Sequence, residues 1–191
     1  MPLNTAQRRQ LLALARSSID SALGRGEFVE PPLAALPVDL MTLQSSFVTL
    51  RIERELRGCC GTLESTRSLA EDVWRNAWAS AFRDPRFLPL TPEEWSQSDI
   101  HVSVLTSAQP MRVANEEDLL SQLRPRVDGL ILELGASRAT FLPAVWEQIR
   151  DPVQFVRELK FKAGWPADFW SPQIRVSTYR SESFGEEEAE G

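Results

Sequence analysis

An arginine, a threonine and both cysteines of the protein are gathered in one stretch, Leu-Arg-Gly-Cys-Cys-Gly-Thr at residues 56–62. The guanidinium of Arg57 offers a planar fork of N–H donors that suits a carboxylate or a phosphate. A cysteine thiol becomes nucleophilic when it loses its proton, and glycine lets a ligand or another strand approach the backbone closely. Segment 56–62 is therefore the candidate functional site, although these residue types alone do not specify a reaction.

Several roles are open to the two cysteines. Cys59 is the candidate nucleophile, with Arg57 supplying a positive field and His101, the only histidine, acting as the base. The alternatives are that the thiols pack as small apolar groups, or that Cys59 and Cys60 form a vicinal disulfide. For His101, the alternative is a half-exposed strand residue without a chemical role. A metal site is not expected, because structural zinc requires four ligands and wider cysteine spacing.

Strand alternation predicts which of these side chains share a face. If segment 56–62 is a regular strand, Arg57 and Cys59 lie on one face, while Cys60 and Thr62 lie on the other and Cys60 faces the core. A β-bulge at one of the two glycines would break this alternation.

A second arginine follows a predicted helix in the sequence Asp84-Pro85-Arg86-Phe87. One interpretation is a helix C-terminal turn that is held by Phe87, since the residue before a proline is disfavoured in a helix. The other is a loop that brings Arg86 beside segment 56–62. The candidate binding residues are therefore Arg57, Gly58, Cys59, Gly61, Thr62 and Arg86.

Composition limits the classes of function. The 191 residues suffice for one compact domain, with room for two lobes. A formal net charge of −6 argues against nucleic-acid binding. No apolar run approaches the roughly 18 residues that a membrane helix needs, the polar N-terminus does not resemble a signal peptide, and the cysteines do not form a disulfide framework. These features predict a cytoplasmic protein that binds neither nucleic acid nor membrane.

Hydrophobic periodicity predicts an alternation of helices and strands. Helices are expected at residues 4–24, 68–84, 115–123 and 152–164, with a short helix after Thr91. Strands are expected at residues 46–52, 56–62, 100–104, 130–134 and 174–179, the first two forming an antiparallel hairpin. The pattern favours an α+β fold with a mainly antiparallel sheet packed with helices. Residues 1–184 would form this domain, and the glutamate-rich residues 185–191 a disordered acidic tail.

An ordered set of short motifs resembles the AMMECR domain family. Segment 56–62 is close to the family signature Leu-Arg-Gly-Cys-Ile-Gly-Thr, and the similarity extends from about Phe47 to Tyr179. The further matches, in the same order, are Asp-Pro-Arg-Phe-Leu-Pro-Leu at 84–90, Val-Ser-Val-Leu at 102–105, Asp-Gly-Leu-Ile-Leu at 128–132, Phe-Leu-Pro at 141–143 and Lys-Ala-Gly at 162–164.

The resemblance implies an α+β fold of two closely associated subdomains and a site at Arg57, Gly58, Cys59, Gly61 and Thr62. Cys60 replaces the usual isoleucine, which favours a buried apolar role for it. Such proteins resemble component A of the AmmeMemoRadiSam set, so the implied partners are a Memo-like protein and a radical SAM enzyme. The family has no established biochemical activity, and no cofactor is implied. Two hypotheses follow: an accessory protein that binds a partner, or a small anionic ligand, through residues 57–62, and an enzyme that uses Cys59 as a nucleophile on a small anionic substrate.

Overall fold

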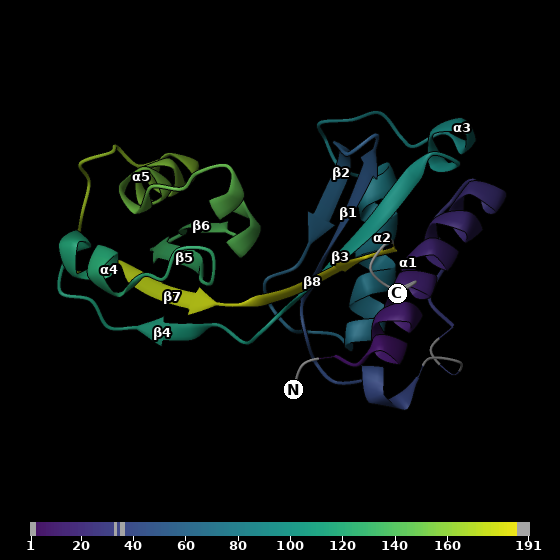
Figure 1. Cartoon of the computed structure of the whole chain (residues 1–191), viewed down its shortest axis with the longest axis horizontal. Helices are drawn as coiled ribbons and strands as arrows, with labels where there is room; N and C mark the ends of the chain where they lie inside the picture. The colour runs from purple at the N-terminus through teal and green to yellow at the C-terminus, as the bar shows by residue number, and fades with distance from the viewer. Residues whose placement is uncertain (1–2, 33, 35–36, 187–191) are drawn as a thin grey trace. The chain divides into compact units, whose positions relative to one another are not determined.

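The chain folds into two compact units in the computed structural model, which describes residues 3–32, 34 and 37–186. Unit 1 comprises Met1–Leu105 together with Glu182–Gly191, and unit 2 comprises Thr106–Ser181. The chain thus leaves unit 1 once, builds unit 2 and returns to unit 1 with its last strand (Figure 1). Antiparallel sheets packed with helices confirm the predicted α+β class.

Helices and one sheet form unit 1. Its sheet has the strand order β2-β1-β3-β8, and α1 and α2 cover one face of it (Figure 1). Both pairings of the central strand β1, with β2 and with β3, are antiparallel. The elements are α1 (Thr5–Arg25), β1 (Ser46–Ile52), β2 (Glu55–Gly61), α2 (Leu69–Phe82), α3 (Pro92–Trp95), β3 (Ser98–Leu105) and β8 (Ser181–Gly185), with a 3-10 turn η2 (Val38–Leu40).

The helix ends in unit 1 follow from local capping. Asn4 and Gln7 form a reciprocal capping box before α1. Ser68 caps α2 by accepting the Glu71 N–H, and Thr91 caps α3 in the same way. Apolar side chains of α1 and α2 then pack on the inward residues of β1 and β3, and this core includes Leu11, Ile19, Val48, Leu50, Val73, Ala77, Ile100 and Val102.

Unit 2 contains a second antiparallel sheet, of order β4-β7-β5-β6. Its core is aromatic: the rings of Trp146 and Phe155 stack with centroids 3.8 Å apart. A fully buried lysine, Lys160, pairs with Glu116 at 2.5 Å. The elements are β4 (Gln109–Met111), α4 (Glu116–Gln122), β5 (Gly129–Leu134), β6 (Ser137–Phe141), η3 (Pro143–Glu147), α5 (Pro152–Lys162) and β7 (Arg175–Tyr179).

The chain end that sequence assigns to an acidic tail begins inside a strand. Gly185 is the last residue of β8, and Glu186 pairs with Arg16 of α1 at 2.7 Å. Residues 187–191, the rest of the expected tail, lie outside the described residues. Among the described residues, no helix combines the length and the apolar character that crossing a bilayer requires.

Candidate functional site

Segment 56–62 runs along β2, one of the two edge strands of the unit 1 sheet, and into the residue that follows it. The predicted hairpin with β1 is present, and its turn places Glu53 and Arg54 at φ 51° and 70°. Two consecutive positive φ values are typical of the type I′ turn, whose twist matches that of the flanking strands. The tight turn therefore brings β2 directly alongside β1.

Gly58 lies where β2 meets the backbone of α2. A Cβ atom on Gly58 would come within 2.1 Å of the Ser80 carbonyl oxygen, so only glycine fits this position. A second contact between β2 and Ser80 is a hydrogen bond, which the Cys60 N–H donates to the Ser80 hydroxyl at 2.8 Å. The glycine is thus required for helix packing, and its position leaves no room for a ligand between β2 and α2.

Asp84 joins the loop after α2 to segment 56–62. Its Oδ2 accepts the Cys59 N–H at 2.9 Å, and both its oxygens accept from the Arg86 guanidinium, at 2.9 and 2.6 Å. The Asp84 side chain is only 3% exposed. Arg86 therefore does lie beside segment 56–62, and the Asp84 carboxylate links the two. That carboxylate already accepts hydrogen bonds from two of the Arg86 nitrogen atoms.

Arg57 is likewise committed to an internal partner. Its Nε and Nη2 donate to the two carboxylate oxygens of Glu94, each at 2.8 Å, and Nη2 also donates to the Leu88 carbonyl at 2.9 Å. Phe87 lies against the guanidinium, with its ring centroid 5.5 Å from Cζ. Nη1 is buried, and no hydrogen-bond partner for it lies among the described residues. Most of the guanidinium N–H donors of Arg57 that were expected to bind an anion are therefore occupied by Glu94.

A β-bulge changes the predicted face of Arg57. The register pairs Leu50 with Gly58 and Arg51 with Leu56, so it skips Arg57. The alternation that predicted a common face for Arg57 and Cys59 is broken at this point, because a bulge adds one residue to one strand only. The guanidinium instead contacts α3 and the loop before it.

The two cysteines lie on opposite faces of β2, and both are half-buried free thiols. Cys60 is opposite Val48, on the face that α2 covers, as the alternation predicts. Burial raises the pKa of the Cys60 thiol, and the negative charge of Asp84 raises it further. Cys59 is opposite Thr49, whose hydroxyl donates to Cys59 Sγ at 3.4 Å. Cys59 is therefore the better candidate for thiolate chemistry.

His101 lies in the same cross-strand row as Cys59, but one strand farther away. Thr49 of β1 pairs with Cys59 on one side and with His101 of β3 on the other. Because neighbouring strands are about 4.8 Å apart, the Cα atoms of Cys59 and His101 are separated by roughly 10 Å. The imidazole lies against Gly185 of β8, where a Cβ would come within 2.6 Å of the ring. Direct proton transfer between Cys59 and His101 would have to cross Thr49.

Comparison with known proteins decides the family. The sequence model of the AMMECR1 family matches residues 12–184. The chain belongs to the AMMECR1 family. A protein of Methanothermobacter thermautotrophicus is 36% identical over 188 residues, covering 97% of each chain. A Thermotoga maritima protein is 31% identical over 169 residues, covering 87% of this chain and 91% of its own. The crystal structure of uncharacterized protein PH0010 from Pyrococcus horikoshii is 34% identical, with a TM-score of 0.85 and coverage of 95% and 92%.

The last two residues of segment 56–62 each contact a neighbouring side chain of unit 1. Gly61 lies against the ring of Phe47, its half-buried partner on β1, and a Cβ on Gly61 would come within 2.3 Å of that ring. The Thr62 hydroxyl lies 2.7 and 2.9 Å from the oxygens of Asp72, a buried residue of α2. Asp72 also accepts the Ser46 N–H at 2.8 Å. Gly61 therefore allows close packing against β1, whereas Thr62 holds the chain after β2 against α2.

Two residues that shape the candidate site were not expected from the sequence of this AMMECR1 protein. Glu94 neutralises Arg57, and Thr49 contacts the candidate nucleophile. Thr49 could have been found from the hairpin, since it is opposite Cys59 once the register is set. Among the described residues, no group of three or more His, Cys, Asp or Glu side chains is arranged to hold a metal ion.

We predict that the two carboxylates make the protein sensitive to acid. Arg86 holds the pKa of Asp84 well below its usual range, and Arg57 lowers that of Glu94 to about 2. Unfolded carboxyl groups titrate near 4, so below that pH the unfolded chain binds more protons than the folded chain. The two carboxylates should therefore make their full contribution to the free energy of unfolding above about pH 5. This contribution should be lost as the pH drops toward 2.

Urea unfolding at pH 6, 4 and 3 measures this loss. The Asp84→Asn variant should be less stable at pH 6 but should lose less stability between pH 6 and 3 than the parent protein. The exposed Asp168 provides the control, since Asp168→Asn should leave the acid dependence unchanged. Equal acid dependence in the parent and Asp84→Asn proteins would contradict the prediction.

Proposed function

We propose that this AMMECR1 protein is an accessory protein that binds partner proteins through residues 57–62 and the loop packed against them. The partners we propose are a Memo-like protein and a radical SAM enzyme, in the cytoplasm. The family resemblance of segment 56–62 supports these partners, and the net charge of −6 argues against a nucleic acid in their place.

The observation that carries the proposal is the exposure of two leucines, each next to the immobilised Arg57. Leu88 is 83% exposed and Leu56 is 41% exposed. Leu56 immediately precedes Arg57, and the carbonyl of Leu88 accepts from it. Exposed apolar side chains on a fixed backbone are typical of binding surfaces, because little conformational entropy is lost on association.

The same contacts argue against a small anionic ligand at this position. Arg57 and Arg86 each form two hydrogen bonds to a carboxylate, so an anion would have to displace Glu94 or Asp84. Breaking a charge-assisted pair of this kind costs more than an exposed anion returns. A protein surface that buries Leu56 and Leu88 requires no such displacement.

Capture experiments with the Memo-like protein and the radical SAM enzyme of the same organism test the proposal. The Leu88→Ser and Leu56→Ser variants should lose capture of at least one partner by tenfold or more, as for residues at the centre of an interface. Leu43 is 67% exposed in the same unit, so Leu43→Ser is the matched control and should bind normally. Unchanged capture by Leu88→Ser and Leu56→Ser, or equal loss in Leu43→Ser, would reject the surface.

The alternative function, an enzyme that uses Cys59 as nucleophile on a small anionic substrate, is favoured by one contact. The Thr49 hydroxyl donates a hydrogen bond to Cys59 Sγ and so orients the candidate nucleophile. Catalysis by Cys59 then predicts that the thiol reacts faster with an alkylating reagent in the folded protein than in the urea-unfolded chain. Alkylation of the Cys60→Ser protein under both conditions at one fixed pH, followed by mass spectrometry, tests this directly. In Thr49→Val the rate in the folded protein should fall, and an unchanged rate would remove the support for this alternative.

A further inference from the structure

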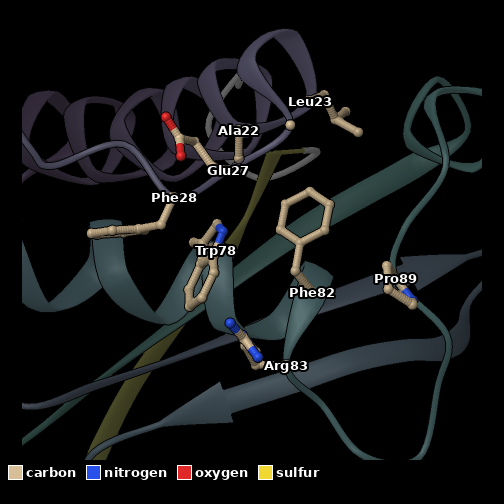
Figure 2. Close-up of a pocket in the computed structure, with 9 residues that line it drawn as sticks. Ala22, Leu23, Glu27, Phe28, Trp78, Phe82, Arg83 and Pro89 are labelled. Atoms are coloured by element: carbon tan, nitrogen blue, oxygen red, sulfur yellow. The ribbon is translucent and has the colours of Figure 1, made fainter.

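A groove of about 560 Å³ lies in unit 1, where the C-terminal end of α1 faces the second half of α2. Its size is within the usual range for small-molecule sites, about 300–1,000 Å³. Figure 2 shows Trp78 and Phe82 from α2 beneath Ala22 and Leu23 of α1, with Pro89 beyond Phe82. None of these side chains takes part in the contacts that hold segment 56–62.

Aromatic rings form the apolar wall of the groove. Phe28 packs edge-on against Trp78 with ring centroids 4.9 Å apart, and Trp78 and Phe82 lie 6.4 Å apart. All three side chains are partly exposed, although aromatic residues of this size are usually covered in a stable core. The wall therefore offers flat apolar surface to a ring-shaped ligand.

Two opposite charges border this wall. The exposed Glu27 lies on one side of Trp78, and Arg83 lies on the other (Figure 2). The Arg83 guanidinium rests over the indole with Cζ 5.1 Å from the ring centroid. Among the described residues, neither Glu27 nor Arg83 has a charged partner, and the indole N–H of Trp78 has no acceptor. A single ligand could thus pair with the Glu27 carboxylate and the Arg83 guanidinium and accept a hydrogen bond from the Trp78 indole N–H.

We propose that this groove binds a small aromatic zwitterion. Its ring lies against Trp78 and Phe82, its acidic group faces Arg83, and its amino group faces Glu27. A neutral ring would leave both charges unused. A purely anionic or cationic ring would pair with only one of them. Charge complementarity at both ends therefore selects a molecule with an acid and an amine on opposite sides of one ring.

The test uses 4-(aminomethyl)benzoate as probe, with benzoate and benzylamine as its two halves. Titrations are followed by NMR through the indole N–H of Trp78, assigned with the Trp78→Phe variant. The buried indole of Trp146, which donates to the Asp128 carbonyl, serves as the internal reference. We expect saturable shifts of the Trp78 signal, with a dissociation constant on the order of 1 mM for a probe of about a dozen heavy atoms.

Charge variants decide the assignment. Arg83→Gln should weaken the probe about two- to fivefold, as expected for an exposed ion pair, and leave benzylamine unchanged. Glu27→Gln should do the reverse, weakening the probe and benzylamine but not benzoate. Arg112→Gln and Glu117→Gln, at exposed positions of unit 2, are the controls and should bind all three compounds as the parent does.

Three outcomes would overturn the proposal. One is the absence of a saturable Trp78 shift, and another is equal affinity of the probe and its halves in every variant. The third is a Trp78 signal that moves with protein concentration without ligand, because this would assign the groove to a second copy of the chain.

Discussion

Replacement of Gly58 by alanine is expected to lower the free energy of unfolding by about 3 kcal/mol or more. The added Cβ would come within 2.1 Å of the Ser80 carbonyl oxygen and 3.0 Å of its carbon. Both atoms belong to the helix backbone, so no side-chain rotation relieves the overlap. To make room, β2 would have to move away from α2, which also breaks the hydrogen bonds to the Cys59 and Cys60 N–H groups.

The matched control is the same substitution at Gly24. Gly24 lies in α1, and a Cβ there would have nothing within 4 Å. Because alanine is the better helix former, Gly24→Ala should be neutral or stabilise the protein by about 0.5–1 kcal/mol. Urea unfolding followed by hydrogen exchange of β1 amides reports on unit 1 alone, since two units can unfold separately. Equal stability of the two variants would refute the packing argument.

The example of Gly58 shows why sequence can mark a candidate segment but not its internal contacts. The residue types in segment 56–62 make it a candidate site, and the glycine suggests a close approach. The residue that Gly58 approaches, Ser80, lies 22 positions later in α2 and is identified only once α2 is packed against the sheet. The same holds for Arg57, because Glu94 is 37 residues away along the chain. An arginine that sequence assigns to an anionic ligand is thus neutralised within the fold.

Local signals were more informative than distant ones. The caps of α1, α2 and α3 were predictable because each depends on residues three positions apart. Strand β8 was not predicted: its sequence, Ser-Glu-Ser-Phe-Gly, lacks apolar alternation, and it is held by β3, about 80 residues earlier. The Ser103 and Ser183 hydroxyls lie 2.8 Å apart across these strands. Pairing of this kind follows from topology, which composition and periodicity do not determine.

The second large effect is expected at Asp72, where one buried carboxylate joins three parts of unit 1. It accepts the N–H and hydroxyl of Ser46 from β1 and the Asn76 side-chain amide from α2, and it pairs with the Thr62 hydroxyl. Arg67 lies 3.6 Å away and supplies the positive charge. Asp72→Ala removes the shared acceptor and leaves several buried donors without a partner. Each such group costs about 1–3 kcal/mol, so a loss of about 4 kcal/mol is expected.

Two control variants show whether the loss in Asp72→Ala comes from its hydrogen bonds or from removing any carboxylate. Asp168→Ala, at an exposed position, should change the unfolding free energy by less than about 0.5 kcal/mol. Thr62→Val removes one contact and should cost about 1 kcal/mol. In the Thr62→Val/Asp72→Ala double variant the losses should not add, because both remove the same hydrogen bond. Additive losses, or equal effects of Asp72→Ala and Asp168→Ala, would show that Thr62 is not held through Asp72. If the losses are not additive, Thr62 has a structural role in fixing the end of β2, and Cys59 remains the candidate for chemistry in segment 56–62.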